Sequence, residues 1–222
     1  MSSVSIGLDE RLQQYLLDVS LHEPAVCARL RERTLTLRES MMISSPEQVQ
    51  LLELLCKMLG ARRGLEIGTF TGYTTLRLTL GLPGLQMTCC DLSEEFTGIA
   101  REHWREAGVD DRVELLLGPA DKSLALMLDD GQAESYDFAY IDADKGGYRN
   151  YAEASLQLVR GGGLVMLDNV LWSGMVADPS DDNEDTESLR DVNQWLYETA
   201  PGRFDLSMIP IGDGLTLLRK FA

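Results

Sequence analysis

Several residue types are scarce in this chain of 222 residues, and each scarcity narrows the kinds of site that it can hold. There are only two histidines, His22 and His103, and both fall in helical stretches, so no triad built on histidine is available. The four cysteines include no CxxC spacing, which argues against a zinc site and against a disulfide scaffold. We therefore expect buried free thiols.

Positive charge is also scarce. Acidic residues outnumber basic ones by 36 to 20, and the formal net charge is −16. This balance disfavours a broad electrostatic contact with nucleic acid or an anionic membrane, although a local basic patch is compatible with it. Apolar runs are far shorter than a membrane span, and the stretch MSSVSIGLDERLQQYLL has neither a basic region nor a long apolar core. We expect a soluble, cytoplasmic chain without a membrane partner.

The spacing of apolar residues predicts one domain over residues 1–222, with an N-terminal helical segment (1–60) and an α/β core (61–222). A chain of this length buries one sizeable core, which argues against two full domains. Within the core, strand-like runs alternate with helical ones. The expected strands are 62–68, 85–91, 112–118, 136–142, 163–168, 204–211 and 214–221.

The segment SSPEQVQLLELLCKMLG has clear helix boundaries. Ser45 is the expected N-cap, Pro46 fits the first helical position, Gln48 completes a capping box and Gly60 ends the helix. Near the C-terminus, the polar stretch 178–187 is interpreted as a solvated loop that leads into a helix near 185–199, and a substrate lid is the alternative.

Repeated strand–helix–strand units predict a parallel sheet with helices on both faces and right-handed crossovers. The short GDG at 212–214 predicts an antiparallel hairpin between the last two strands. In such sheets, ligands bind beyond the carboxyl ends of the strands. The residues that directly follow each strand are therefore the candidate site.

The first three strand ends together suggest a site shaped for a nucleoside. Gly68 and Gly72 in EIGTFTGY allow close approach of a ligand, although their spacing does not match the dinucleotide fingerprint GxGxxG. Asp91 can accept hydrogen bonds from two ribose hydroxyls, and Ala120 in GPAD can lie beside an adenine ring. A tight turn at the glycines and a helix-capping role for Asp91 remain the alternatives.

Oxygen ligands follow the fourth and fifth strands. Asp142 ends YDFAYID, and Asp168 and Asn169 end GLVMLDN. If these strands are neighbours, two carboxylates and one amide carbonyl meet at one edge of the sheet. That set, without cysteine or histidine, suits a hard cation, with Mg²⁺ favoured and Ca²⁺ or Mn²⁺ also suitable. The alternative is that these are ordinary polar residues at the point where strands emerge.

These segments resemble the cation-dependent, S-adenosylmethionine-dependent O-methyltransferases of the caffeoyl-CoA and catechol type, in a form similar to bacterial members. The similarity covers nearly the whole chain. The matching segments are MMISSPEQVQLL, GLEIGTFTGYTTL, CCDLSEE, GPA, YIDADKGGYRNY, LDNVLWSG and PIGDGLTLLRK. Val49 departs from the resemblance, because many relatives carry glycine there.

The resemblance implies a role for each matching position. For S-adenosylmethionine the implied residues are Ser44, Glu66, Gly68, Thr74, Asp91, Ala120 and Asp144. For the divalent cation they are Asp142, Asp168 and Asn169. Lys145 corresponds to the proposed catalytic base. Substrate contacts are implied for Asp142, Tyr148, Tyr151 and Trp172.

The resemblance also implies a fold and an activity. The fold is a Rossmann-like class I methyltransferase: a seven-stranded, mostly parallel sheet with an antiparallel last strand and helices on both faces. The activity is methyl transfer to a hydroxyl of a metal-chelated vicinal diol on a small aromatic acceptor (a catechol, hydroxycinnamoyl or flavonoid-like compound), and relatives are commonly homodimers.

Other functions are weighed against this one. Methylation of a hydroxylated uridine in tRNA is the alternative within the family, and the acidic net charge counts against it. An oxidoreductase is disfavoured by the missing GxGxxG. A non-catalytic relative is disfavoured because the metal set and Lys145 are all present.

Overall fold

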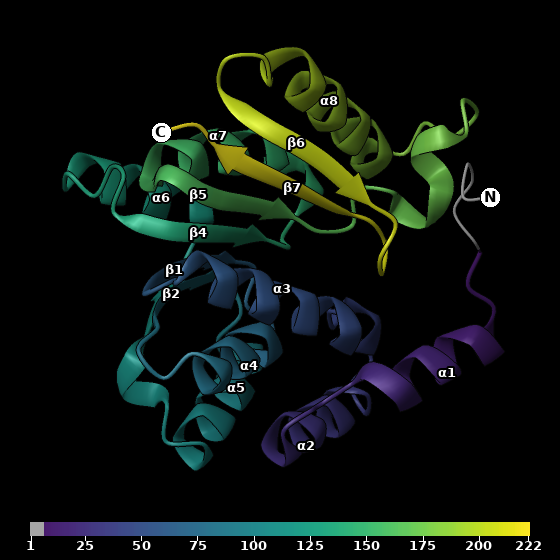
Figure 1. Ribbon diagram of the computed structural model, residues 1–222, viewed down its shortest axis with the longest axis vertical. Coiled ribbons are helices and arrows are strands. Elements are labelled where there is room, and N and C mark those ends of the chain that lie inside the picture. Colours follow the sequence, from purple (N-terminus) through teal and green to yellow (C-terminus); the bar gives the residue numbers. More distant parts are fainter. Residues whose placement is uncertain (1–6) are drawn as a thin grey trace.

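The structure of the protein, a computed structural model, describes residues 7–222 and contains a seven-stranded sheet in the order β3-β2-β1-β4-β5-β7-β6 (Figure 1). Residues 1–6, which open the stretch considered for a targeting signal, lie outside the described residues. The strands are β1 (Arg63–Ile67), β2 (Gln86–Asp91), β3 (Val113–Leu117), β4 (Tyr136–Ile141), β5 (Val159–Leu167), β6 (Phe204–Ile209) and β7 (Leu215–Lys220).

The strand directions follow the predicted pattern. The pairs from β3 to β5 are all parallel, whereas β7 pairs antiparallel with both β5 and β6. Only β7 therefore opposes the other strands of this sheet, and the hairpin predicted at 212–214 joins β6 to β7. The predicted Rossmann-like sheet is confirmed.

Helices cover both faces of the sheet (Figure 1). They are α1 (Glu10–Ser20), α2 (Ala25–Thr34), α3 (Pro46–Leu59), α4 (Tyr73–Gly81), α5 (Glu94–Glu106), α6 (Ala120–Asp129), α7 (Tyr148–Leu158) and α8 (Glu184–Thr199). One core packs against α3, α4 and α5, and the other packs against α6, α7 and α8. The sequence of strand β4 is apolar throughout because both of its faces are buried. Phe138 and Tyr140 enter the first core, whereas Ala139 and Ile141 enter the second.

The capping box predicted for α3 is wrong. Pro46 opens the helix and Gly60 ends it in the left-handed conformation, as expected. However, the Ser45 side chain makes no capping hydrogen bond. The Gln48 side chain does not fold back to its own helix, because it is buried and its amide donates to the carboxylate of Asp168. A hydrogen bond from Gln48 to a charged carboxylate is stronger than one with the neutral backbone amide at the start of the helix, and this favours the observed contact.

Strand β5 begins earlier than the sequence suggests. Its first residue is Val159, directly after the end of α7 at Leu158, whereas the strand was expected to begin at residue 163. Val159 pairs with Tyr136, and the register shifts before Phe138 pairs with Leu164. Gly161, Gly162 and Gly163 lie in this irregular part of the strand. Because they have no side chains, the spacing of apolar residues could not assign them to a strand.

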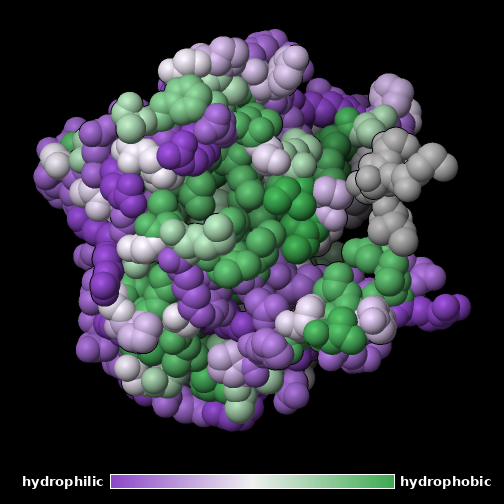
Figure 2. All heavy atoms as spheres, in the orientation of Figure 1, coloured by the Kyte–Doolittle hydropathy of each residue, from purple (hydrophilic) through white to green (hydrophobic). Residues whose placement is uncertain are grey.

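Further features of the structure concern the cysteines, the character of the helices and the surface. All four cysteines are free and buried, as predicted. No helix within residues 7–222 combines the length and the apolar character that a membrane crossing requires. Apolar side chains gather at the centre of the face shown in Figure 2, and polar ones surround them.

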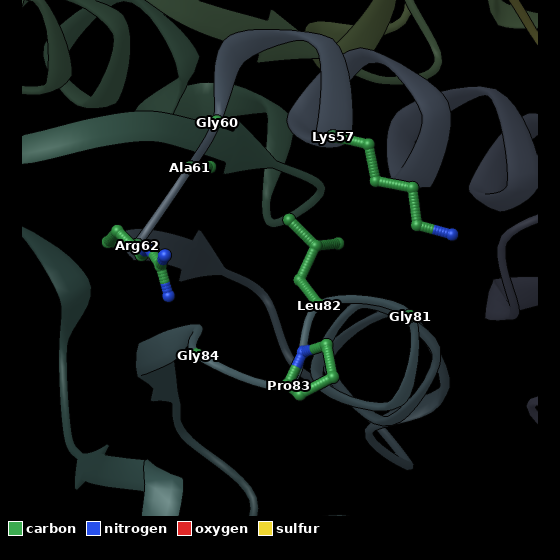
Figure 3. Close-up of a pocket in the computed structure, with 8 residues that line it drawn as sticks. All are labelled: Lys57, Gly60, Ala61, Arg62, Gly81, Leu82, Pro83 and Gly84. Carbon is green, nitrogen blue, oxygen red and sulfur yellow. The ribbon is translucent and has the colours of Figure 1, made fainter.

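A hollow of about 270 Å³ lies between the ends of α3 and α4 (Figure 3). Arg62 at its edge directly precedes β1, so the hollow is at the amino ends of the strands. Its lining residues are Lys57, Gly60, Ala61, Arg62, Gly81, Leu82, Pro83 and Gly84. None of them is a carboxylate or a predicted site residue, and this hollow is therefore not the candidate site.

Candidate active site

The candidate site lies at the carboxyl ends of three neighbouring strands. The amide of Asp142, just after β4, donates to the carbonyl of Ile67 on β1 (2.8 Å). The amide of Asp168, just after β5, donates to the carbonyl of Ile141 on β4 (3.0 Å). The parallel register therefore brings the two aspartates to one edge of the sheet, as the order of the strands requires.

The two carboxylates are linked through hydroxyl groups. Ser44 Oγ lies 3.3 Å from Asp142 Oδ2 and 3.1 Å from the hydroxyl of Tyr140. Tyr140 in turn donates to Asp168 Oδ2 (2.5 Å), and Gln48 Nε2 donates to the same oxygen (2.6 Å). Sequence patterns missed Tyr140 and Gln48, because one lies inside an apolar strand and the other resembled a helix cap.

Burial and mutual repulsion disfavour the charged forms of both aspartates. Burial, followed by the charge of Asp168, raises the pKa of Asp142 to about 7. Burial also raises the pKa of Asp168, although hydrogen bonds from Tyr140 and Gln48 oppose this effect. A cation between the two carboxylates would favour their charged forms.

Lys145 is buried among these groups. Its ammonium donates to Asn169 Oδ1 (2.6 Å), to the Tyr148 hydroxyl (2.7 Å) and to the carbonyl of Ala143 (3.0 Å). It also lies 3.6 Å from Asp142 Oδ1. Burial lowers its pKa, and the neighbouring carboxylates oppose the shift. A buried amine with a lowered pKa is suited to accept a proton.

The implied divalent cation fits the chemistry of this donor set. Asp142 and Asp168 supply carboxylate oxygens, and Asn169 supplies an amide oxygen that already accepts from a cationic group. Within residues 7–222, no three His, Cys, Asp or Glu side chains form a potential metal site. The fit therefore depends on Asn169 as the third ligand, and hard cations accept such a mixed oxygen set.

The turn after β1 forms the other half of the site. Gly68 has φ +88°, and a Cβ at this position would lie 1.8 Å from the carbonyl oxygen of Asp142, so only glycine fits. Glu66 is buried and accepts from the Thr75 hydroxyl (2.6 Å). Burial raises the pKa of Glu66 to about 8. Thr74 Oγ1 lies 3.5 Å from Ser44 Oγ, and this contact connects the turn to the aspartates.

Asp91 holds the backbone of this turn. Its Oδ2 accepts from the amides of Thr69 (2.9 Å) and Phe70 (2.7 Å), and its Oδ1 accepts from the amide of Ser93 (2.7 Å). The carbonyl of Asp91 accepts from the amide of Gly118, close to Ala120 at the start of α6 (2.9 Å). A carboxylate has about four acceptor positions, so one remains for a ligand hydroxyl, whereas the sequence suggested that Asp91 could accept from two.

Two of the residues with predicted roles pair with each other. The Tyr151 hydroxyl donates to Asp144 Oδ1 (2.8 Å), whereas Tyr148 and Trp172 flank Lys145. The structure thus joins Tyr151, expected at the substrate, to Asp144, expected at the cofactor. His103 bonds within its own helix, to the carbonyl of Ile99, and takes no part in the site.

Comparison with known proteins places this geometry in a family. The family model described as O-methyltransferase matches residues 17–221. The chain belongs to the O-methyltransferase family. It is 41% identical over 182 residues to the probable caffeoyl-CoA O-methyltransferase 2 of Dictyostelium discoideum (81% of this chain, 78% of the relative). It is 37% identical over 213 residues to the catechol O-methyltransferase domain-containing protein 1 of Mus musculus (96% and 80%).

Solved O-methyltransferase structures show the same fold. TomG from Streptomyces achromogenes, in complex with SAM, superposes with a TM-score of 0.84 at 28% identity and covers 96% of each chain. The O-methyltransferase from Bacillus cereus, in complex with SAH, gives a TM-score of 0.84 at 29% identity (95% of this chain, 97% of that one). These similarities confirm the predicted family.

Proposed function

We propose that this O-methyltransferase transfers the methyl group of S-adenosylmethionine to a hydroxyl of a vicinal aromatic diol held by a divalent cation. The observation that carries the proposal is that Asp142 and Asn169 meet at the ammonium of Lys145, next to the turn at Gly68, while the backbone amide of Asn169 donates to the carboxylate of Asp168. The SAM and SAH bound to the similar TomG and Bacillus cereus structures support the choice of cofactor.

Asp142, Asp168 and Asn169 would hold the cation, with Mg²⁺ favoured. When bound, the cation would lower the pKa of a phenol and orient its oxygen. Gln48 and Tyr140 hold the carboxylate of Asp168, and Ser44 holds that of Asp142. These contacts leave little rotational freedom to the two ligands, which is what a precise metal geometry requires.

Lys145 is the proposed base. Its amine would take the proton of the attacking hydroxyl, whose oxygen then bonds to the methyl carbon while the bond from sulfur to methyl breaks. The products are a methyl ether, S-adenosylhomocysteine and a protonated lysine. A phenol has a pKa near 10 and is mostly protonated at neutral pH, so a buried amine with a lowered pKa assists the reaction.

The acceptor class is tested by a methyl-transfer screen with radiolabelled S-adenosylmethionine. Catechols, hydroxycinnamoyl thioesters, flavonoids and bulk tRNA are compared, each with Mg²⁺ and with excess chelator. We expect label on vicinal diols only, and none on analogues that lack one of the two hydroxyls. Label on tRNA but on no small diol would contradict the proposed acceptor class.

A further inference from the structure

The segment between β5 and α8 has a backbone that side chains rarely adopt. Asn169, Trp172 and Ser173 have φ values of 55°, 46° and 52°. This left-handed region favours glycine, and other residues persist there only where their surroundings hold them. We call residues 169–181 the strap.

Two side chains on α8 hold the strap: Asn193 Nδ2 donates to the carbonyl of Val170 at its start (2.9 Å), and Arg190 holds its later part. Arg190 Nε donates to the carbonyl of Val176 (3.1 Å), and Nη1 donates to that of Asp181 (2.8 Å). Its Nη2 donates to the carbonyls of Met175 (3.0 Å) and Asp178. A planar guanidinium with donors in several directions can join four carbonyls in this way, whereas an ammonium cannot. An ion pair with Glu187 completes its contacts.

The other side of the strap is fixed by the turn between β6 and β7. The amides of Leu171 and Ser173 donate to the carbonyl (3.0 Å) and to Oδ1 (2.5 Å) of Asp213. A Cβ on Gly214 would lie 2.5 Å from Leu171 Cγ. The GDG sequence therefore holds the strap as well as turning the chain.

The strap carries two residues that contact Lys145. The amide oxygen of Asn169 lies 2.6 Å from the Lys145 ammonium, and the Trp172 ring centroid lies 5.4 Å from it. Both belong to the strained part of the strap. A displacement of the strap therefore changes the surroundings of Lys145 on the acceptor side, and leaves the turn at Gly68 in place.

We infer that Arg190 is a positioning residue for the acceptor: by holding the strap, it fixes Asn169 and Trp172 beside Lys145. The inference rests on the proposed function, since it concerns the acceptor side of that site. A purely structural role for Arg190, through its carbonyl bonds or its ion pair with Glu187, would lower stability without a selective effect on the acceptor. Glu187 is 56% exposed, and exposed ion pairs contribute little to stability.

The test compares Arg190→Met and Arg190→Lys with two controls. Glu187→Gln removes only the ion pair, and Arg149→Met removes an arginine that stacks on Trp195 at 5.3 Å. We expect the acceptor KM to rise at least about tenfold in Arg190→Met and by less in Arg190→Lys, while the affinity for S-adenosylmethionine stays within about twofold. Both controls should match the wild type.

Hydrogen exchange of the amides of Ser173 and Gly174 supplies a readout that needs no activity. It should accelerate in Arg190→Met, and the exchange of the sheet amides should not. An unchanged acceptor KM with active enzyme overturns the inference, as does unchanged exchange in the strap or an equal loss of acceptor and cofactor affinity. A wild-type enzyme that methylates no acceptor contradicts the proposed function instead, and the exchange data then decide whether Arg190 holds the strap.

Discussion

Lys145 is the residue on which the proposed chemistry depends most. Its ammonium touches Asn169, Tyr148 and the carbonyl of Ala143, and it is only 8% exposed. None of its partners comes from the turn after β1, where the cofactor is proposed to bind. Its role in turnover is therefore separable from cofactor affinity.

Lys145→Met should lower kcat by about a hundredfold or more, because general-base catalysis contributes about 10²–10⁴-fold. The affinity for S-adenosylmethionine, measured by isothermal titration calorimetry, should change little. An unaltered kcat in this variant would exclude Lys145 as the base.

Glu66 gives a prediction about pH. Burial raises its pKa to about 8, against about 4.3 for an unfolded glutamate. Between these values the folded chain binds the extra proton, so this group makes stability fall as pH rises. As the pH rises through this range, the free energy of unfolding of the wild type should therefore fall relative to that of Glu66→Gln, by up to about 1.4 kcal/mol per pH unit.

Urea unfolding at about pH 6 and about pH 8, with chelator present, measures this difference. Glu114→Gln changes an exposed glutamate on β3 and is the matched control. If the stabilities of Glu66→Gln and the wild type change in parallel between the two pH values, the buried carboxyl is already ionised and the account of its environment is wrong.

At the scale of elements, buried polar groups attach the N-terminal helices to the core. Arg77 on α4 pairs with Glu53 on α3 through Nε (2.5 Å) and reaches Gln50 Oε1 (3.2 Å). Glu23, just before α2, accepts from the Tyr73 hydroxyl on α4 (2.5 Å). Helix α1 itself buries no residue. These contacts therefore hold the segment that delivers Ser44 to the site.

Arg77→Met should destabilise the fold by about 3 kcal/mol, because it leaves the buried carboxylate of Glu53 with a single cationic partner. Arg29→Met is the control, since its ion pair with Glu106 is exposed and contributes at most about 1 kcal/mol. Chemical unfolding of the two variants measures both changes. An equal loss of stability would show that the network at Arg77 is no stronger than a surface pair.

The elements also show what the sequence can predict. Asp142, Asp168 and Asn169 were predicted together, because residues after adjacent parallel strands must meet at one edge. Gln48 was assigned to a helix cap, since its true partner, Asp168, is 120 positions away and no local pattern connects them. Arg190 was missed for a similar reason: it bonds backbone carbonyls, which carry no sequence signal.

At the scale of the whole molecule, the homodimer stays a prediction, for which exposed apolar side chains on α3 and β6 offer apolar surface. Leu54 and Met58 on α3 are 54% and 77% exposed, and Met208 on β6 is 39% exposed. Such a surface favours contact with another protein. Light scattering should give about twice the chain mass of 24.7 kDa. A mass of one chain at micromolar concentration would contradict the prediction.

Methyl transfer from S-adenosylmethionine to a catechol, with Mg²⁺ and with excess chelator, tests the central claim most directly. Wild type and Asp168→Asn are compared, and Asp130→Asn, at the exposed end of α6, is the control. We predict that chelator abolishes wild-type turnover and that Asp168→Asn loses at least about a hundredfold in Mg²⁺. Wild-type turnover that is the same in chelator as in Mg²⁺ would contradict the account.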